Sequence, residues 1–558
     1  MASSRASSFS KLNIHKGFIS ELPGESLEKP IDFNDENQVE LTRTRRLVKK
    51  GCWAYTVPEK SPFPVLVHTS PSMLKELELS SDYAKTSEFL KVVVGNQLLE
   101  GTTPFSQAYA GFQFGYFAGQ LGDGRAMSLF EVLTSEGKNW ELQLKGSGET
   151  PFSRMGDGYA VVRSSIREYL ASEAMHAIGV PTTRALSLAK TGQIVARESL
   201  EDGAIVCRVS PTWVRFGSFE LHRMLKQPEE LKQLADYTIK HHFPSLLTST
   251  QENENIYEKF FEEVCLKSAT MVGHWQATGF VHGVMNTDNM SITGLTLDYG
   301  PYGFLETYTP DWTPNSSDTE SLYKFANQPV IVRWNLEKLG LALYPLFSNP
   351  QDKETADHPA ILNGLEVYET AYAQKHDELM SERLGLDFNS TTVQNRLPTI
   401  LKHLFEFLKT SQVDYHQFLR YLGKVGDFIV DNADLAQEDL KSKIASLIEQ
   451  RFAKQDTKPK EEFDAFLDLY IPLIKEQYTK SSSKPSQLTN AKNPRFVLRN
   501  WIAQEVIDAA NKGDFKPLEA AYTLLTSYAY AEDKELTGRY SGPSQDPSCT
   551  MTQCSCSS

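Results

Sequence analysis

Two hydrophobic periods divide the chain near residue 215. Before that point, apolar and polar residues alternate in short runs such as WELQLKG (140–146), and this period of two predicts half-buried strands. One segment of the same half, 161–181, repeats its apolar residues about every four positions and predicts a helix. After residue 215 the helical period dominates, as in the amphipathic stretch 257–279. The order predicts a two-lobed enzyme with its site in the cleft.

Polar stretches rich in Ser, Pro or Gly mark further boundaries along the chain. The pattern predicts an α+β fold with a helical C-terminal extension. The expected parts are an N-terminal segment (1–38), a β-rich lobe with one main helix (39–215), a helical lobe (216–395), a helical extension (396–536) and a flexible tail that contains cysteines (537–558).

Composition narrows the class of protein. The chain has 558 residues, of which 40% are apolar and 23% are charged, as in a large globular protein. No run approaches the roughly 18 consecutive apolar residues of a membrane span, so we expect no membrane insertion. The net charge of −14 argues against nucleic-acid binding, which usually requires a basic face.

The first twenty residues are rich in Ser and basic, and no acidic residue precedes Glu21. This composition is typical of an organelle transit peptide and is compatible with a mitochondrial location. A disordered tail of a cytoplasmic protein has the same composition, so both interpretations remain open.

Two glycine turns are candidates for phosphate binding. In GQLGDGR (119–125), closely spaced glycines let backbone N–H groups approach phosphate oxygens. Gly122, Gly124 and the adjacent cation Arg125 are therefore candidate ligands, with a plain hairpin turn as the alternative. A second turn follows at Asp157 and Gly158.

Charged residues in the predicted strands and helix extend this set. Lys145 ends a predicted strand, and Glu168 lies on the following helix, which resembles the Lys–Glu pair of protein kinases. A solvated Lys and a surface ion pair are the alternatives. Arg208 lies in an otherwise apolar strand and needs an anionic partner if it faces inward. Together with Arg215, it suits a polyphosphate.

The stretch HGVMNTDNMSITGLTLDYG (282–300) resembles a kinase catalytic loop followed by a metal-binding Asp. Asn289 and Asp298 are oxygen donors suited to Mg²⁺ that bridges nucleotide phosphates. Val284 stands where a kinase has its catalytic Asp, whereas Asp288 lies further along the loop. The glycine turn, Lys, helix Glu, Asn and D-Y-G occur in kinase order, which predicts a kinase-like nucleotide site.

Four longer blocks resemble one family. They are GDGRAMSLFEV, LQLKGSGETPFSRMGDGYAVVRSSIREYLASEAMHAIGVPTTRAL, FVHGVMNTDNMSITGLTLDYGPYGF and NPRFVLRNWIAQEVIDAANKGD. These are similar to the signature blocks of the selenoprotein O family, also called YdiU. The resemblance implies a protein-kinase-like pseudokinase fold that transfers AMP from ATP to Ser, Thr or Tyr hydroxyls of proteins, which include itself as a candidate. It also implies that ATP lies inverted relative to a kinase and that the targets belong to mitochondrial redox metabolism.

The resemblance assigns roles by motif. The implied nucleotide ligands are Gly122, Gly124, Arg125, Lys145, Asp157, Gly158, Arg208, Arg215 and Asp298. Asn289 and Asp298 are implied to hold Mg²⁺, with Mn²⁺ as an alternative. Asp288 is implied to be the proton acceptor and Glu168 the helix partner of Lys145.

The tail carries a second likeness. Family members in animals place a selenocysteine shortly before two final serines, and Cys556 stands at that place. Cys554 and Cys556 form a C-x-C pair, which suits a redox couple or a pair of soft metal ligands. Bacterial relatives can pair a tail Cys with one in the activation segment, but residues 306–318 contain no Cys, and Pro314 stands at the expected place.

Two other functions compete with AMP transfer. One is a phosphorylating kinase of unusual sequence, against which Val284 and the extra arginines argue. The other is an inactive nucleotide-binding scaffold, against which the presence of Asp288, Asn289 and Asp298 argues.

Overall fold

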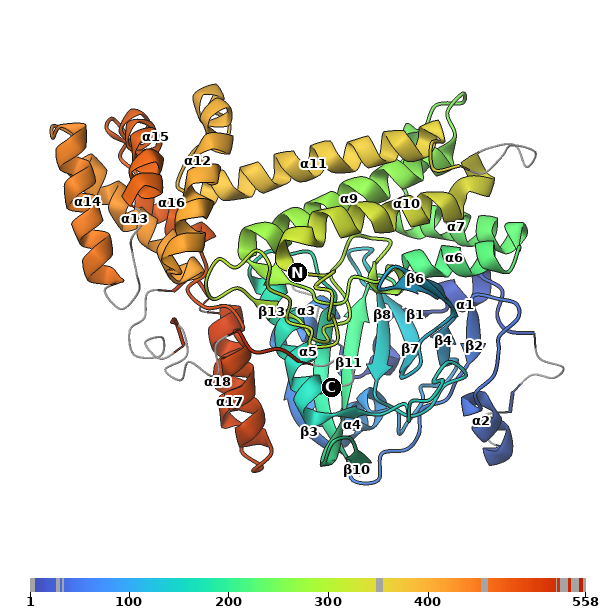
Figure 1. Cartoon of the computed structure of the whole chain (residues 1–558). Coiled ribbons are helices and arrows are strands. Elements are labelled where there is room, and N and C mark those ends of the chain that lie inside the picture. The colour runs from blue at the N-terminus through green and yellow to red at the C-terminus, as the bar shows by residue number, and fades with distance from the viewer. Residues whose placement is uncertain are drawn as a thin grey trace.

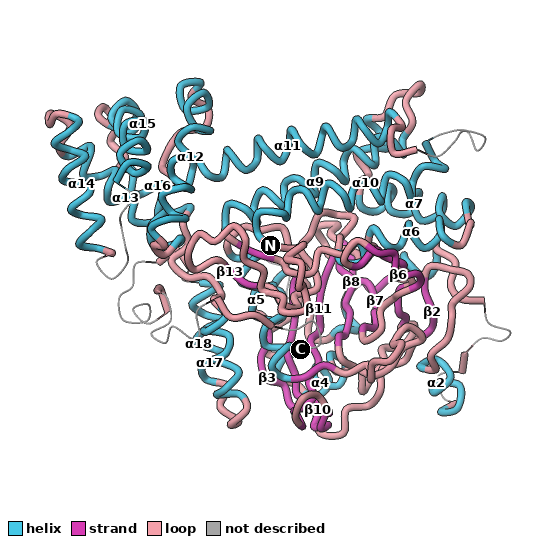
Figure 2. Tube along the Cα trace, viewed as in Figure 1, coloured by secondary structure: helices cyan, strands magenta, loops and turns pink. Residues whose placement is uncertain are grey.

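The fold combines one large antiparallel sheet with a layer of long helices above it and a further group of helices at one side (Figures 1 and 2). The structure is a computed structural model that describes residues 6–26, 31–32, 35–347, 355–452, 460–527, 529–531, 540–542 and 551–554. Its mixture of helices and strands confirms the α+β class.

The sheet forms the β-rich lobe. Seven strands follow the order β2-β4-β7-β8-β11-β10-β3, while β1 pairs with β7 and β9 with β11, all antiparallel. Their bounds are β1 Ile14–His15, β2 Trp53–Tyr55, β3 Val65–Thr69, β4 Phe105–Gln107, β7 Ala126–Leu133, β8 Asn139–Lys145, β9 Ala160–Val161, β10 Arg184–Ala196 and β11 Leu200–Ser210. The run predicted as a strand, 140–146, lies in β8 and the residue after it, so the period of two was a valid guide.

Two shorter pairs of strands lie outside the large sheet. The hairpin of β5 (Ala110–Gln113) and β6 (Tyr116–Gln120) projects from the lobe, and β12 (Phe280–Val281) pairs with β13 (Gly303–Phe304).

The main helix of this lobe is α5 (Val162–Ala177), which packs on β10 and β11. Its apolar stripe is fully buried, with Ile166, Leu170 and Ala174 at most 3% exposed. The helix ends before Gly179, whose positive φ of 82° suits the left-handed turn that follows a helix. The helix predicted over 161–181 is therefore confirmed.

The N-terminal segment does not stand apart from the lobe over its described residues. β1 pairs with β7, and α1 (Gly17–Glu21) packs beside it. Phe9 stacks on Phe89, and Phe18 stacks on Phe105, both with exposures of 1% or less. Residues 6–26 are thus part of the lobe, whereas the boundary at residue 38 treated them as separate.

The helical lobe is built on α9 (Ile256–Thr278), which corresponds to the predicted helix 257–279. Asn255 caps its start, and Gly279 ends it in the left-handed conformation. The helices packed around α9 or beside it are α6 (Phe216–Met224), α7 (Pro228–His242), α8 (Leu246–Ser249), α10 (Gln328–Phe347) and α11 (Pro359–Arg383).

The C-terminal extension packs as two separate units. The helices α12 (Thr391–Ser411), α13 (Tyr415–Asp431), α14 (Gln437–Arg451), α15 (Lys460–Tyr478) and α16 (Pro485–Lys492) surround a core of their own at one end of α11 (Figure 1). The chain then returns to the β-rich lobe, where α17 (Asn500–Ala510) and α18 (Lys516–Ser527) pack on α5. No helix within the described residues is long and apolar enough to cross a membrane.

Candidate active site

Lys145 joins the β-rich lobe to the helical lobe. It ends β8, and its Nζ lies 2.8 Å from Glu168 Oε2 on α5 and 2.6 Å from Asp298 Oδ1 in the D-Y-G turn. The Lys and Glu side chains are less than 10% exposed. The solvated Lys and the surface ion pair that competed with this interpretation are therefore wrong.

Arg208 reaches the same carboxylates from β11. Its Nη1 lies 2.9 Å from Glu168 Oε1 and 3.6 Å from Asp298 Oδ1, and its guanidinium lies 4.5 Å from the centre of the Trp213 ring. Its Nη2 donates to the Gln143 side chain. The anionic partner expected of an inward-facing Arg in an apolar strand is thus Glu168.

Arg215 connects the network to the loop that carries Asp288 and Asn289. From the residue before α6, its Nη1 donates to the Asp288 carbonyl at 2.7 Å and approaches Asn289 Oδ1 at 3.4 Å. Its Nη2 lies 3.5 Å from Asp123 Oδ1, and its guanidinium lies 4.7 Å from the centre of the Tyr109 ring. Sequence reasoning missed Asp123, although its place between Gly122 and Gly124 could have drawn attention to it.

The cations set the charge of the carboxyl groups around them. Burial alone would raise the pKa of Glu168, but Lys145 and Arg208 hold that pKa below its usual value. Burial opposes the charged form of Asp298 too, yet Lys145, Arg215 and Arg208 together keep its pKa well below the usual range. Both carboxylates therefore carry a negative charge at neutral pH.

Asp288 lies in the short 3-10 helix Thr287–Asn289 and is 7% exposed. Burial raises the pKa of Asp288 to about 6, against the opposing effect of Arg215. Gln113 of the β5–β6 hairpin donates to its Oδ2 at 3.1 Å. A carboxyl group with a pKa near neutrality is suited to accept a proton during catalysis.

The loop before Asp288 has a fixed geometry. His282 Nε2 lies 3.0 Å from the Leu297 carbonyl, so this nitrogen carries the proton, and Nδ1 accepts the Val284 N–H at 3.3 Å. Asn289 Nδ2 donates to the Val284 carbonyl at 3.1 Å, which directs Asn289 Oδ1 toward Arg215. Val284, which stands where a kinase has its Asp, thus takes part in these hydrogen bonds through its backbone N–H and carbonyl.

Three buried polar atoms in this network have no hydrogen-bond partner among the described residues. They are Arg208 Nε, Arg215 Nε and Asp288 Oδ1. Buried donors and acceptors normally have hydrogen-bond partners, so several unsatisfied polar atoms in one network indicate a candidate ligand site. Two spare guanidinium donors suit phosphate oxygens, and a spare carboxylate oxygen suits a hydroxyl proton.

The glycine turns lie at the edge of this network. Gly122 has a positive φ of 141°, and a Cβ there would come within 2.3 Å of the Phe152 ring. Gly124 lies against the Phe152 backbone, while Arg125 is half-buried. Asp157 forms an ion pair of 2.7 Å with Arg197, and Gly158 packs on the Gly148 backbone. In the described part of the chain, neither the Asp157 nor the Arg125 side chain forms a hydrogen bond or ion pair with Lys145.

Asn289 and Asp298 offer one amide and one carboxylate oxygen to a metal ion. In the described part of the chain, no group of three or more His, Cys, Asp or Glu side chains is placed to hold a metal. Two oxygen donors beside the unsatisfied guanidinium nitrogens of Arg208 and Arg215 fit Mg²⁺, which is commonly held by one or two side chains together with substrate phosphates and water.

The tail contacts the activation segment. Cys554 and Asn315 form a parallel bridge, in which Cys554 N–H donates to the Pro314 carbonyl at 2.8 Å and Ser316 N–H donates to the Cys554 carbonyl at 3.0 Å. Asn315 also donates from its side chain to the Gly283 carbonyl at 2.9 Å. Residues 551–554 are thus bound, although a flexible tail was expected. Cys554 is a free thiol, and Cys556 lies outside the described residues.

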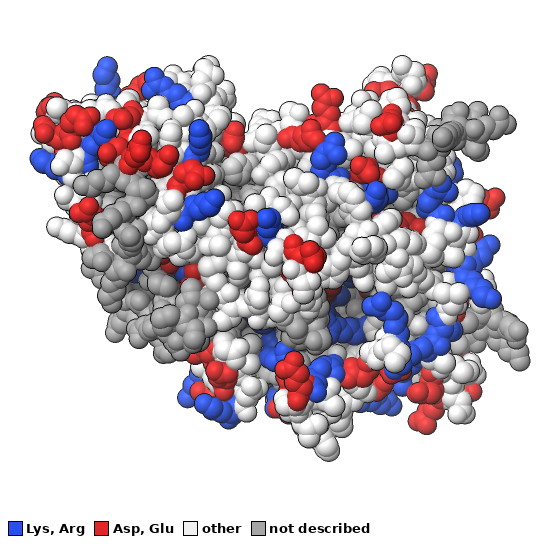
Figure 3. Space-filling view, in the orientation of Figure 1, with Lys and Arg blue, Asp and Glu red and all other residues white. Residues whose placement is uncertain are grey.

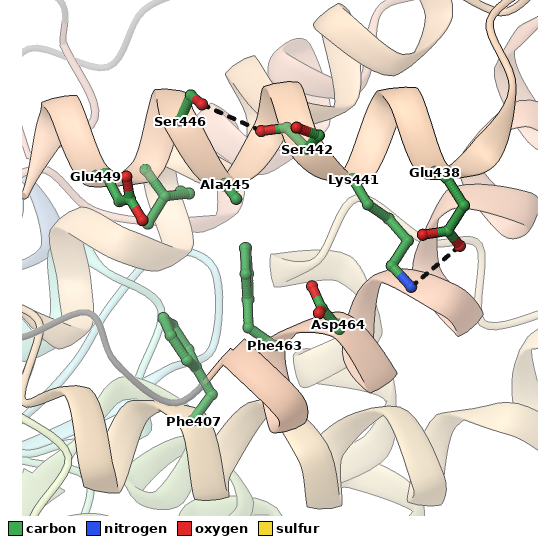
Figure 4. A pocket seen from close by; sticks show the side chains of 10 residues that line it. Phe407, Glu438, Lys441, Ser442, Ala445, Ser446, Glu449, Phe463 and Asp464 are labelled. Atoms are coloured by element: carbon green, nitrogen blue, oxygen red, sulfur yellow. Dashed lines mark hydrogen bonds and ion pairs between the residues drawn. The ribbon is translucent and has the colours of Figure 1, made fainter.

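Surface charge and cavities agree only in part with this location. On the face in Figure 3, Lys and Arg side chains line a recess in the lower half of the view, over the β-rich lobe. A cavity of about 320 Å³ lies elsewhere, between α12, α14 and α15 (Figure 4). Phe407 and Phe463 form the floor of this cavity. None of the candidate site residues lines it, so we do not assign the active site to it.

Comparison with known proteins settles the family. The family model described as "Protein adenylyltransferase SelO" matches residues 38–526. The chain belongs to the SelO family of protein adenylyltransferases. It is 40% identical to the protein nucleotidyltransferase YdiU of Methylobacillus flagellatus, over 92% of this chain and 93% of that protein. It is 39% identical to the YdiU of Flavobacterium johnsoniae, over 98% of this chain and 99% of that protein. An ATP-dependent protein nucleotidyltransferase is therefore the enzyme class of this SelO-family chain.

Proposed function

We propose that this enzyme transfers AMP from ATP to Ser, Thr or Tyr hydroxyls of proteins and uses Asp288 as the proton acceptor. The observation that carries the proposal is the buried network of Lys145, Arg208 and Arg215 beside Asp288, whose Oδ1 has no hydrogen-bond partner among the described residues. Cations next to a carboxyl group of raised pKa suit phosphoryl chemistry, which depends mainly on positioning and charge neutralisation.

The reaction has a simple balance. The acceptor oxygen forms a bond to the α-phosphorus of ATP, the bond from that phosphorus to the bridging oxygen breaks, and pyrophosphate leaves. The hydroxyl proton passes to Asp288. Lys145, Arg208 and Arg215 hold the phosphate oxygens, while Glu168 orients Lys145 and Arg208. Gly122, Gly124, Arg125, Asp157 and Gly158 are proposed to contact the nucleotide at the edge of the site.

Asn289 and Asp298 are the residues proposed to hold Mg²⁺, or Mn²⁺ in its place. When bound, the ion supplies positive charge to the phosphates of the nucleotide. Asn289 is oriented for this by its bond to the Val284 carbonyl, and Asp298 by its ion pair with Lys145.

We propose that the fold is that of a protein kinase and that ATP is inverted within it. The proposal is supported by the order of the strand Lys, helix Glu, loop Asn and D-Y-G Asp and by the ion pairs that Lys145 makes with Glu168 and Asp298. Inversion is supported by Arg208 and Arg215, which line the space beneath the sheet with Asp123. That space suits a triphosphate better than an uncharged adenine ring.

The decisive test uses ATP labelled at the α- or the γ-phosphate. We expect label on protein from the α-labelled nucleotide only, and Asp288→Asn is expected to lower the rate by about 10²–10⁴-fold, the usual value of a general base. Asp236→Asn, a surface change on α7, is the matched control. Transfer of the γ-label would identify a phosphorylating kinase, and nucleotide binding without transfer would identify a scaffold.

Two further proposals concern modification of the enzyme by itself and its location in the cell. Intact-mass measurement with Mg-ATP tests whether the enzyme modifies itself, since each event adds the mass of one AMP. The mitochondrial location and a role in redox metabolism rest on the N-terminal composition and the family resemblance. Cell fractionation tests the location, and a purely cytoplasmic distribution would contradict it.

A further inference from the structure

Glu220 is a buried carboxyl group that none of the roles above explains. It lies on α6 and is 4% exposed. Its Oε2 accepts a hydrogen bond of 2.7 Å from the Thr287 hydroxyl, and its Oε1 has no partner among the described residues. Burying a carboxyl with one oxygen unsatisfied costs stability, so packing alone does not account for this residue.

The Thr287 hydroxyl is the junction between Glu220 and the β5–β6 hairpin. Thr287 Oγ1 accepts the Phe112 N–H at 2.8 Å while it donates to Glu220. A hydroxyl has a single proton, so donation to Glu220 leaves only lone pairs for the Phe112 N–H. Glu220 thereby fixes the rotation of the hydroxyl in the one direction that holds the hairpin backbone.

The hairpin that is held in this way contacts Asp288. Gln113, the residue after Phe112, donates to Asp288 Oδ2. A Cβ at Gly111 would come within 2.5 Å of Asp288 Oδ1, and a Cβ at Gly217 of α6 within 2.1 Å of the Ala110 carbonyl. The helix α6, the β5–β6 hairpin and the loop that carries Asp288 are therefore closely packed. A shift of the hairpin would change the contacts of Asp288.

We propose that Glu220 is a positioning residue that, through the Thr287 hydroxyl, holds the β5–β6 hairpin against the catalytic loop and so fixes Gln113 on Asp288. The catalytic part of this inference rests on the proposed role of Asp288; the mechanical part, from Glu220 to the hairpin, does not.

The protonation of Glu220 decides which substitution preserves its contact. Burial raises the pKa of Glu220 to about 8, with Asp288 of the loop acting in the same direction and the Thr287 hydrogen bond and Lys338 of α10 opposing it. At neutral pH the carboxyl is therefore largely protonated and accepts through its carbonyl oxygen. Glutamine has the same acceptor in the same place, whereas leucine has a similar volume and no acceptor.

The test is a set of variants measured for transfer and for backbone protection. Glu220→Leu and Thr287→Val remove the junction from either side, Glu220→Gln and Thr287→Ser preserve it, and Glu230→Gln on α7 is the control for a change of carboxyl elsewhere. We expect kcat to fall about tenfold in the first two, the value of one ordinary hydrogen bond, with KM for ATP unchanged. Hydrogen–deuterium exchange should speed up at the Phe112 amide.

The double variant separates positioning from general damage. If Glu220 acts through Thr287, Glu220→Leu with Thr287→Val is no slower than either single change. Multiplied losses, an unprotected Phe112 amide in Glu220→Gln, or unchanged exchange in Glu220→Leu would each overturn the proposal. If Glu220→Leu does not fold, Thr287→Val against Thr287→Ser makes the same comparison. Full activity of Asp288→Asn would instead refute the proposed proton acceptor and leave the exchange result to judge Glu220.

Discussion

The contacts of the individual site residues are determined by burial more than by their neighbours in the sequence. Lys145, Glu168 and Arg208 come from three separate elements, yet their ion pairs could be foreseen, because an inward-facing charge requires a partner. Asp123 and Gln113 could not, since nothing in the local pattern shows which polar residue turns inward. Their partners lie 92 and 175 residues away along the chain.

Glu141 is a residue at which the effect of burial on a carboxyl pKa, and through it on stability, can be measured. It lies in β8 and is 1% exposed; burial, with Glu131 nearby, raises its pKa to about 8. A carboxyl whose pKa is raised in the folded state favours folding below its unfolded pKa of about 4.3, and this contribution is lost as the pH rises through 8.

We therefore expect Glu141→Gln to be more stable than the wild type at pH 8 and equally stable near pH 4. Glutamine keeps the acceptor for the Ser128 hydroxyl and has no charge to bury. The gain should grow by at most about 1.4 kcal/mol per pH unit between these limits. Thermal unfolding over a pH series measures it, and a difference that does not vary with pH would contradict the pKa of this group.

At the scale of elements, α5 is held from two sides. Glu168 on one face pairs with Lys145, while the opposite part of the helix contacts α18. The Tyr522 hydroxyl lies 2.9 Å from Ser70 Oγ, and His68 links Tyr169 of α5 to Glu519 of α18 with contacts of 2.7 Å. The helix that presents Glu168 is therefore supported by the C-terminal part of the chain.

Tyr522→Ala is expected to lower both stability and transfer. The side chain is 6% exposed, and truncation of a buried aromatic residue costs about 3–5 kcal/mol. Because α5 loses its support, kcat should fall more than in Phe466→Ala, which opens a cavity in the separate core of α12–α16. Equal losses of kcat at equal loss of Tm would show that α18 does not act on α5.

The elements of the chain were more predictable than their assembly. α5, α9 and β8 follow from hydrophobic period and end signals within single segments. The return of α17 and α18 to the β-rich lobe depends on contacts across more than 300 residues, which periodicity does not encode.

At the scale of the whole molecule, the N-terminal segment belongs to the folding unit. Its Ser-rich, basic composition does not reveal that Phe9 and Phe18 pack against other aromatic rings of the lobe. Removal of this segment would uncover part of the core beneath the sheet.

Phe18→Ala tests this membership. The ring is 1% exposed between Phe105 and Tyr237, so its loss should lower the free energy of unfolding by about 3–5 kcal/mol. Chemical denaturation measures the change, and Leu41→Ala, a change at an exposed position of α2 (Glu36–Arg43), is the control. A change below about 0.5 kcal/mol, the usual range of surface substitutions, would show that the segment is dispensable.

The ion pairs across the cleft have a consequence for the form in which ATP arrives. The network holds three cations, Lys145, Arg208 and Arg215, and four carboxyl groups, Asp123, Glu168, Asp288 and Asp298. The carboxyl groups offset part of the positive charge, so the three cations alone would neutralise a bare triphosphate only in part. We therefore expect the nucleotide to enter with divalent counterions, so that removal of these ions weakens its affinity as well as slowing the reaction.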